Sequence, residues 1–179
     1  AAACATGPAP TVGCEINSVD TTYNMEGDIT PDPNINGISY SIDADNNILN
    51  LIGNIAVSGD FGSGIVLTDS DFNKSTITGN ITTAGEQGWG IHFESGSNSN
   101  TTIIKGNIDT QGLNSYGIFL ERGDSNTINV TGNITTTERG SDGIQIGTIA
   151  SVNTLNTINV TGNITTITNG SEGIYMINS

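Results

Sequence analysis

The sequence predicts an all-β protein built as a parallel β-helix (β-solenoid) of about six coils. The first observation is a repeated unit, because residues 126–136 and 156–166 contain the same eleven letters, Asn-Thr-Ile-Asn-Val-Thr-Gly-Asn-Ile-Thr-Thr. The second is a period, since the Gly of a Gly-Asn-Ile or Gly-Asp-Ile unit recurs in steps of 26, 26, 27, 26 and 30 residues, at Gly27, Gly53, Gly79, Gly106, Gly132 and Gly162. The third is a Gly-Ile pair that keeps phase with it, at Gly64, Gly90, Gly117, Gly143 and Gly173. A fixed period of this length is typical of a solenoid.

Residues 1–20 precede the repeats, and we interpret them as an N-terminal cap or lead-in segment. They contain Cys4 and Cys14, the only two cysteines of the chain. A disulfide between them would close a small loop and would indicate an oxidising compartment, whereas two unpaired thiols are the alternative.

The coils are expected over residues 21–179. Side chains of a strand alternate between the two faces of a sheet, so taking Ile134 as inward fixes the direction of its neighbours. In the stretch around Gly-Asn-Ile the inward residues are then Leu49, Leu51, Ile55, Ile77, Ile81, Ile104, Ile108, Ile128, Val130, Gly132, Ile134, Ile158, Val160 and Ile164. In the Gly-Ile strand they are Ile65, Leu67, Ile91, Phe93, Ile118, Leu120, Ile144, Ile146, Ile174 and Met176.

Three sides are expected for a coil of about 26 residues. The sequence predicts the third strand in the less regular stretch that follows the Gly-Ile strand, where the 30-residue coil also inserts its extra residues, at about 148–153. We expect a right-handed helix from the general rule for parallel crossovers.

A column of asparagines precedes the first strand of successive coils. Stacked amides at a bend can hydrogen-bond from coil to coil, which predicts a structural ladder of Asn47, Asn73, Asn100, Asn126 and Asn156.

The Gly-Asn-Ile, Gly-Ile and Asn-Thr-Ile units over residues 21–179 resemble the repeats of bacterial autotransporter passengers and related surface adhesins. This resemblance implies a β-helical stalk that is exported to the cell surface, with host or neighbouring-cell glycans or proteins as partners. It implies neither catalysis nor a cofactor. The alternative function is a self-assembling subunit that forms head-to-tail filaments with other copies of itself through open solenoid ends.

Charge narrows the choice of partners. The chain has 18 acidic residues against 4 Lys and Arg, a formal net charge of −14, so it is expected to repel nucleic acids and anionic membrane surfaces. No apolar run approaches the roughly 18 residues that span a bilayer, so this segment is not expected to insert into a membrane. Together with the resemblance, this favours an extracellular location.

A polysaccharide-acting enzyme is a distant third hypothesis. Asp142 and Glu172 share a phase in adjacent coils, yet no basic residue joins their column, and the four cations Lys74, Lys105, Arg122 and Arg139 do not share one phase. The single histidine, His92, is expected on the outer face as an exposed residue. We therefore expect no catalytic residues and no metal site. Ice binding is equally remote, because the outward Thr columns (Thr78, Thr131 and Thr161; Thr82, Thr135 and Thr165) are interrupted by other residues.

The best candidate for a binding surface is a set of outward residues on and beside the Gly-Ile strands. Exposed aromatic side chains on one flank are typical of contact surfaces for glycan or protein. The alternative is that a long helix simply tolerates some outward aromatics. The candidate flank comprises Val66, Trp89, His92, Tyr116, Phe119 and Tyr175.

Overall fold

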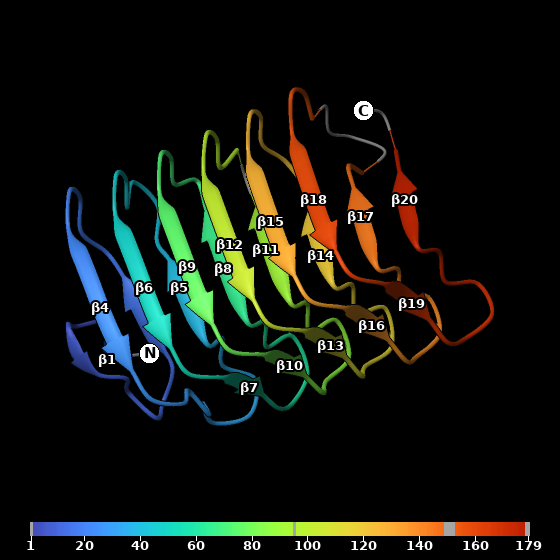
Figure 1. The fold of residues 1–179 in the computed structure, drawn as a ribbon, viewed down its shortest axis with the longest axis horizontal. Helices are drawn as coiled ribbons and strands as arrows, with labels where there is room; N and C mark the ends of the chain where they lie inside the picture. The colour runs from blue at the N-terminus through green and yellow to red at the C-terminus, as the bar shows by residue number, and fades with distance from the viewer. Residues whose placement is uncertain (1, 95, 149–152, 178–179) are drawn as a thin grey trace.

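A computed structural model describes residues 2–94, 96–148 and 153–177 of the chain. These residues form twenty short strands and no helix, and every strand pairs in parallel with its counterpart one coil away. The strands stack into three sheets, of which the one that begins at β7 is shorter than the other two (Figure 1). The predicted fold class, a parallel β-solenoid of about six coils, is therefore confirmed.

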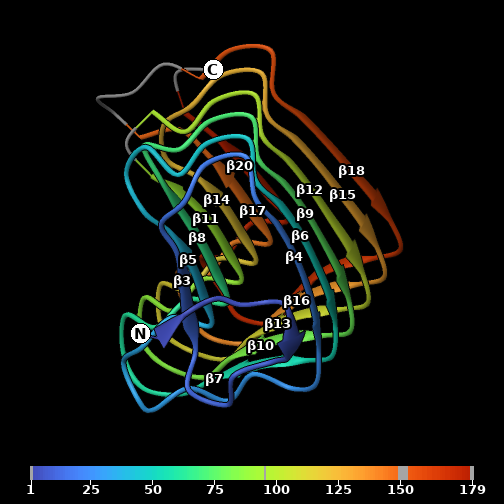
Figure 2. The ribbon, with the colours of Figure 1, turned by 90° about the vertical axis from the view of Figure 1, so that its left-hand side faces the viewer.

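The three sheets form the three sides of the coil, as the view along the stack shows (Figure 2). Sheet A contains β1 Ala2–Ala3, β3 Cys14–Ile16, β5 Ile38–Tyr40, β8 Ile65–Thr68, β11 Ile91–Glu94, β14 Ile118–Leu120, β17 Ile144–Ile146 and β20 Ile174–Met176. Sheet B contains β2 Gly7–Pro8, β4 Thr22–Glu26, β6 Ile48–Ile52, β9 Lys74–Thr78, β12 Thr101–Lys105, β15 Thr127–Thr131 and β18 Thr157–Thr161. Sheet C contains β7 Ile55–Val57, β10 Ile81–Thr83, β13 Ile108–Thr110, β16 Ile134–Thr136 and β19 Ile164–Thr166.

The third strand does not lie where the sequence pattern placed it. The eleven-residue unit holds two strands in two sheets, for example β15 and β16, and its glycine is the corner between them. The stretch after the Gly-Ile strand is a bend instead. The prediction was wrong because the alternation of inward and outward side chains continues across the corner. Ile134 therefore points inward whether the unit is one strand or two. The extra residues predicted at 148–153 fall mostly on 149–152, which lie outside the described residues.

The corner glycine is required by close approach of the coils. Gly132 has a φ of 153°, and a Cβ atom placed on it would lie 2.2 Å from the carbonyl oxygen of Gly106 in the preceding coil. Any side chain there would therefore push two backbones apart.

The core is a single column of apolar side chains enclosed by the three sheets. The predicted inward isoleucines and leucines from residue 49 to residue 134 are buried, as are Ile65, Phe93 and Leu120 of sheet A. Register is constant, because each strand pairs with the equivalent residues of the next coil; Ile128 pairs with Ile158, for instance. At the last described coil the same inward positions are open to solvent, with Ile174 54% and Met176 56% exposed.

Residues 2–20 lie at the other end of the described stack. Their strands β1, β2 and β3 already join sheets A and B, so this segment is continuous with the solenoid. A disulfide joins Cys4 to Cys14, and both cysteines are buried in the core.

Backbone groups at the bends are satisfied by stacked polar side chains. In the predicted ladder, the amide N–H of Asn47 donates to Asn73 Oδ1, and Asn73 donates in turn to Asn100 Oδ1, both at 2.8 Å. The ladder continues in the same sense through Asn126 to Asn156. A second column runs in the opposite sense, since the N–H of Asn133 donates to Asn107 Oδ1 in the coil before it.

Candidate functional site

Four aromatic rings lie together on the outer side of sheet A, around β11 and β14. The imidazole of His92 is stacked on the ring of Phe119, with centroids 4.9 Å apart and planes 3° from parallel. Trp89 lies against both, with centroid distances of 4.3 Å to His92 and 5.4 Å to Phe119. Tyr116 completes the group, 5.2 Å from Phe119 and 6.5 Å from Trp89. We call these four residues the aromatic patch.

Register explains why these four side chains meet. His92 pairs with Phe119 one coil on, so both point outward from the same position of sheet A. Trp89 and Tyr116 occupy the corner before their strands, where the Gly90 N–H donates to the Tyr116 carbonyl at 3.0 Å. Two positions per coil in two adjacent coils therefore bring four rings to one place.

The expectation of an exposed His92 is wrong. Its side chain points outward, yet it is only 2% exposed, because the neighbouring rings and the acidic side chains beside it cover the imidazole. Phe119 is likewise 7% exposed. The exposed part of the patch is contributed by Trp89 and Tyr116, which are partly buried. The indole Nε1 of Trp89 is buried and makes no hydrogen bond.

Two carboxylates flank the histidine. His92 Nδ1 lies 3.5 Å from Glu94 Oε1, and His92 Nε2 lies 3.3 Å from Glu121 Oε2. The contact with His92 lowers the pKa of Glu121, burial partly opposes this effect, and the charge of Arg122 lowers the pKa further. Glu94 is held from its other side by the Thr68 hydroxyl, which donates to Oε2 at 2.9 Å. The imidazole is thus fixed between two acids and two rings.

A second acidic pair lies beyond Tyr116 in the same corner column. Asp142 is 7% exposed and accepts a hydrogen bond on Oδ1 from the N–H of Glu172 at 2.6 Å. Burial raises the pKa of Asp142, the hydrogen bond from the Glu172 N–H partly opposes this rise, and the charge of Glu172 adds a smaller one. Burial also raises the pKa of Tyr116, with Asp142 as the next cause.

The other members of the predicted flank are less closely involved. Val66 pairs with His92 on the side nearer the N-terminus and is 6% exposed, so it extends the buried base of the patch. Tyr175 is 39% exposed. It lies two coils from Phe119, and Gln145 occupies the same position in the coil between them. The structure therefore divides the flank into a packed cluster and an outlying tyrosine.

Two groups of the structure were not predicted from the sequence. The first is the pair Glu94 and Glu121, which stand two residues after His92 and Phe119 and so occupy the same position in adjacent coils. This spacing was visible in the sequence and could have identified them. An inward Thr column was also missed, in which the hydroxyls of Thr83 and Thr110 donate to the carbonyls of Gly88 and Ser115 at 2.7 and 2.8 Å. The Ile-x-Thr spacing of the last four strands of sheet C, β10, β13, β16 and β19, indicates that column.

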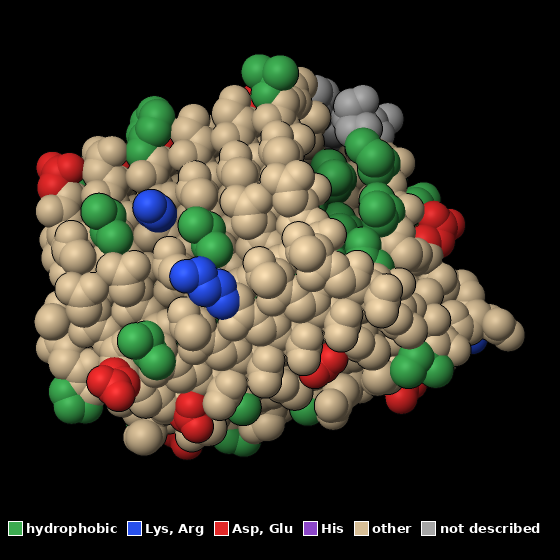
Figure 3. Space-filling model, viewed as in Figure 1, with side chains coloured by type: hydrophobic (Ala, Val, Ile, Leu, Met, Phe, Trp, Pro, Cys, Tyr) green, Lys and Arg blue, Asp and Glu red, His purple; other side chains and the backbone are tan. Residues whose placement is uncertain are grey.

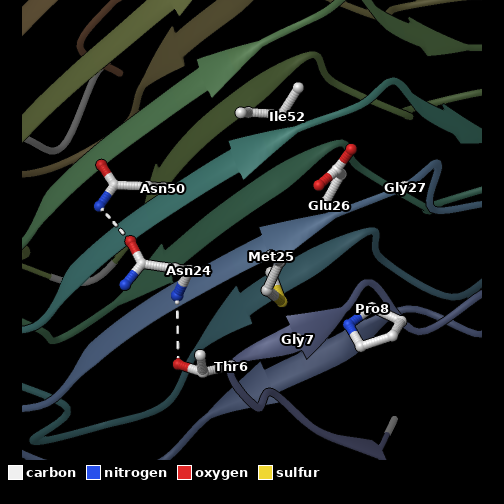
Figure 4. Close-up of a pocket in the computed structure, with 9 residues that line it drawn as sticks. All are labelled: Thr6, Gly7, Pro8, Asn24, Met25, Glu26, Gly27, Asn50 and Ile52. Atoms are coloured by element: carbon white, nitrogen blue, oxygen red, sulfur yellow. Dashed lines mark hydrogen bonds between the residues drawn. The ribbon is translucent and has the colours of Figure 1, made fainter.

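A groove lies elsewhere, at the N-terminal end of sheet B (Figure 4). This groove of about 740 Å³ is lined by Thr6, Gly7, Pro8, Asn24, Met25, Glu26, Gly27, Asn50 and Ile52. Its polar atoms largely bond to each other, since Asn50 donates to Asn24 Oδ1 at 2.8 Å and the N–H of Asn24 donates to the Thr6 hydroxyl at 3.2 Å. It contains none of the predicted contact residues.

The outer face of sheet B is sparsely charged. In Figure 3, which shows this face, most of the surface is backbone or side chains that are neither hydrophobic nor charged, and few lysine or arginine side chains are visible. The aromatic patch belongs to sheet A, whose strands lie behind those of sheet B in Figure 1.

Within the described ranges, no group of three or more His, Cys, Asp and Glu side chains is arranged to hold a metal ion. The same ranges contain no helix of the length and apolarity needed to cross a bilayer.

Comparison with known proteins gave no match. No family model matches the chain, and neither the curated proteins nor the solved structures contain a similar one at a significant level.

Proposed function

We propose that this chain is a non-catalytic, extracellular segment of a bacterial surface protein of the autotransporter-passenger kind, with a structural and adhesive role. The observation that carries the proposal is the aromatic patch, which groups four rings on the outside of an otherwise repetitive solenoid. Tryptophan and tyrosine that are partly exposed and rigidly packed are typical of contact surfaces. The disulfide between Cys4 and Cys14 supports an oxidising, extracellular setting.

The structural part of the role is supported by the continuous stacking of the coils. Each coil hydrogen-bonds to its neighbours through three sheets and through the asparagine columns, so the segment is a rigid rod. Carboxylates that lie in bends accept backbone N–H groups, as Asp71 Oδ1 does from Asn98 at 2.6 Å. These acids have a structural use that needs no catalytic explanation.

The test is retention of the purified chain on epithelial cell layers and on an array of immobilised glycans and extracellular-matrix proteins. The double variant Trp89→Ala/Tyr116→Ala should lose most of the retention. The matched control Phe61→Ala/Phe72→Ala removes two aromatics that are 64% and 62% exposed in bends and that are not part of the four-ring patch, and it should retain the wild-type signal. Circular dichroism melts establish that both variants are folded.

Wild-type chain that is retained on none of these surfaces would exclude the adhesive role. Equal losses in the two double variants would show that the patch is not the contact surface.

The second proposal is assembly of copies end to end, and it depends on the open apolar positions of the last described coil. Stacking another coil on this end, from the same polypeptide or from a second copy, would bury Ile174 and Met176. In the filament proposal the coil comes from a second copy. Electron microscopy and size exclusion over a concentration series should then show growing filaments, and Met176→Lys should abolish them. Monomers at all concentrations would contradict this proposal.

A further inference from the structure

A corner column on sheet A places aromatic and acidic side chains in one line. The carbonyls of Trp89, Tyr116, Asp142 and Glu172 each accept a hydrogen bond from a glycine N–H one coil earlier, at 2.9, 3.0, 3.2 and 2.8 Å. The four residues are therefore stacked along the axis in successive coils. With strands spaced about 4.8 Å apart, the column extends over about 14 Å. An extended peptide of four or five residues covers that length.

The acidic half of the column has no counter-charge. Asp142 is 7% exposed and lies against Glu172, and in the described part of the chain the ion pairs are those of His92 with Glu94 and Glu121. The hydrogen bond from the Glu172 N–H to Asp142 Oδ1 offsets part of the cost of burying this carboxylate, but no cation is paired with it, and a second carboxylate beside it adds repulsion. Burial and the neighbouring carboxylate both raise the pKa of Asp142. A cation beside this pair would relieve both costs.

The aromatic half of the column also favours a cation. The rings of Trp89 and Tyr116 lie in adjacent coils with their planes 15° apart. The face of an aromatic ring carries partial negative charge, and Trp and Tyr faces attract ammonium and especially guanidinium groups. The whole chain, at −14, adds a long-range field of the same sign.

We infer that the column of Trp89, Tyr116, Asp142 and Glu172 binds an arginine- or lysine-bearing segment of a partner polypeptide. The cationic side chains lie against the two rings and beside the two carboxylates. A neutral glycan would use the rings but would leave the acidic pair without a counter-charge, so the polypeptide fits better. This inference rests on the proposed adhesive role of the patch and specifies the chemistry of its partner.

Intrinsic fluorescence offers a direct test, because Trp89 is the only tryptophan of the chain. Titration with a hexa-arginine peptide at low ionic strength and neutral pH should give a saturable change in emission. The double variant Asp142→Asn/Glu172→Gln should weaken binding at least tenfold. It removes both charges, while the amide oxygen introduced at position 142 can still accept the bond from the backbone N–H of residue 172. Added salt should weaken wild-type binding.

The matched control is Asp60→Asn/Glu86→Gln. This exposed pair makes the same contact, with the Glu86 N–H donating to Asp60 Oδ1 at 3.0 Å, and the variant changes the net charge by the same amount. It should weaken binding less than twofold. Equal weakening in both double variants would overturn the inference, because it would show attraction to the overall charge and not to the column.

Titration with the neutral oligosaccharide cellohexaose tests the cationic partner and the adhesive patch separately. If this sugar perturbs Trp89 and the peptide does not, the cationic partner is excluded while the adhesive patch stands. If neither probe perturbs Trp89, the inference fails, and the cell-retention assay with Trp89→Ala/Tyr116→Ala decides the adhesive role by itself.

Discussion

His92 and Phe119 lie face to face across adjacent coils, with ring planes 3° apart and centroids separated by 4.9 Å. This stack uses the strand spacing of the solenoid directly, because two rings at one register position are held about 4.8 Å apart by the backbone. The sheet therefore presents the rings already arranged, and no loop has to order for the patch to form.

The contact between His92 and Glu121 predicts an acid-dependent loss of stability. The pKa of Glu121 is lowered in the folded state, so its contribution is present above the ordinary glutamate pKa and is lost as the pH falls through the lowered value. Glu121→Gln should reduce stability by roughly 0.5 kcal/mol at neutral pH, a small amount because the side chain is 33% exposed and screened by solvent. Urea denaturation over a pH series measures this, and the wild-type and variant curves should converge in acid. Glu86→Gln, in an exposed bend, should leave the profile unchanged.

The raised pKa of Asp142 predicts that, in contrast to Glu121, this carboxylate destabilises the folded chain at neutral pH. Its pKa is raised in the folded state, so the folded chain holds the proton more tightly and the carboxylate opposes folding above that pKa. Asp142→Asn keeps an oxygen for the Glu172 N–H and should stabilise the chain by roughly 0.5 kcal/mol at neutral pH. The gain should shrink as the pH falls and the wild-type carboxyl protonates. A variant that is less stable than wild type at neutral pH would contradict this account.

The asparagine ladder predicts a large cost for removing one rung. Asn100 Oδ1 accepts the N–H of Asn73, and Asn100 Nδ2 donates to the Ser70 carbonyl at 2.8 Å, all in buried positions. Asn100→Ala should leave both backbone groups unsatisfied and cost roughly 2–4 kcal/mol. Asn107→Ala removes one acceptor from the exposed column, where water can replace it, and should cost less than about 1 kcal/mol. Chemical denaturation of both variants tests the difference.

The glycines in bends predict that the room for a Cβ atom, more than the strain of a positive φ, determines the cost of replacing a glycine by alanine. Gly132 and Gly170 both have positive φ, 153° and 79°, but a Cβ atom meets a backbone oxygen at 2.2 Å in Gly132 and nothing within 4 Å in Gly170. Gly170→Ala should cost about 1–2 kcal/mol from strain alone. Gly132→Ala should cost roughly 3 kcal/mol or more, or prevent folding. Similar thermal midpoints for the two variants would show that the coils can separate locally at the corner.

The period of the sequence was enough to predict the solenoid, its register and most of its core. It was not enough to find the corner inside the eleven-residue unit, because the side chains of Val130 and Ile134 point inward whether or not the chain turns between them. The positions of Trp89, His92, Tyr116 and Phe119 within the repeat predicted that these residues would be neighbours. Their burial could not be predicted, because it depends on the sizes of four side chains packed over one another, and alternation describes direction alone.

The two asparagine columns, which hydrogen-bond in opposite senses along the stack, make each coil complete only with a neighbour on both sides. Residues 126–136 and 156–166 are identical, so joining Ser125 directly to Asn156 would excise thirty residues and leave the same letters after the junction. After the excision, the strands of all three sheets and the asparagines of both columns would pair again with their counterparts in the next remaining coil. The length of such a rod can therefore change by whole coils, through duplication or loss of the repeat, while the strand pairing and the asparagine columns keep the same pattern.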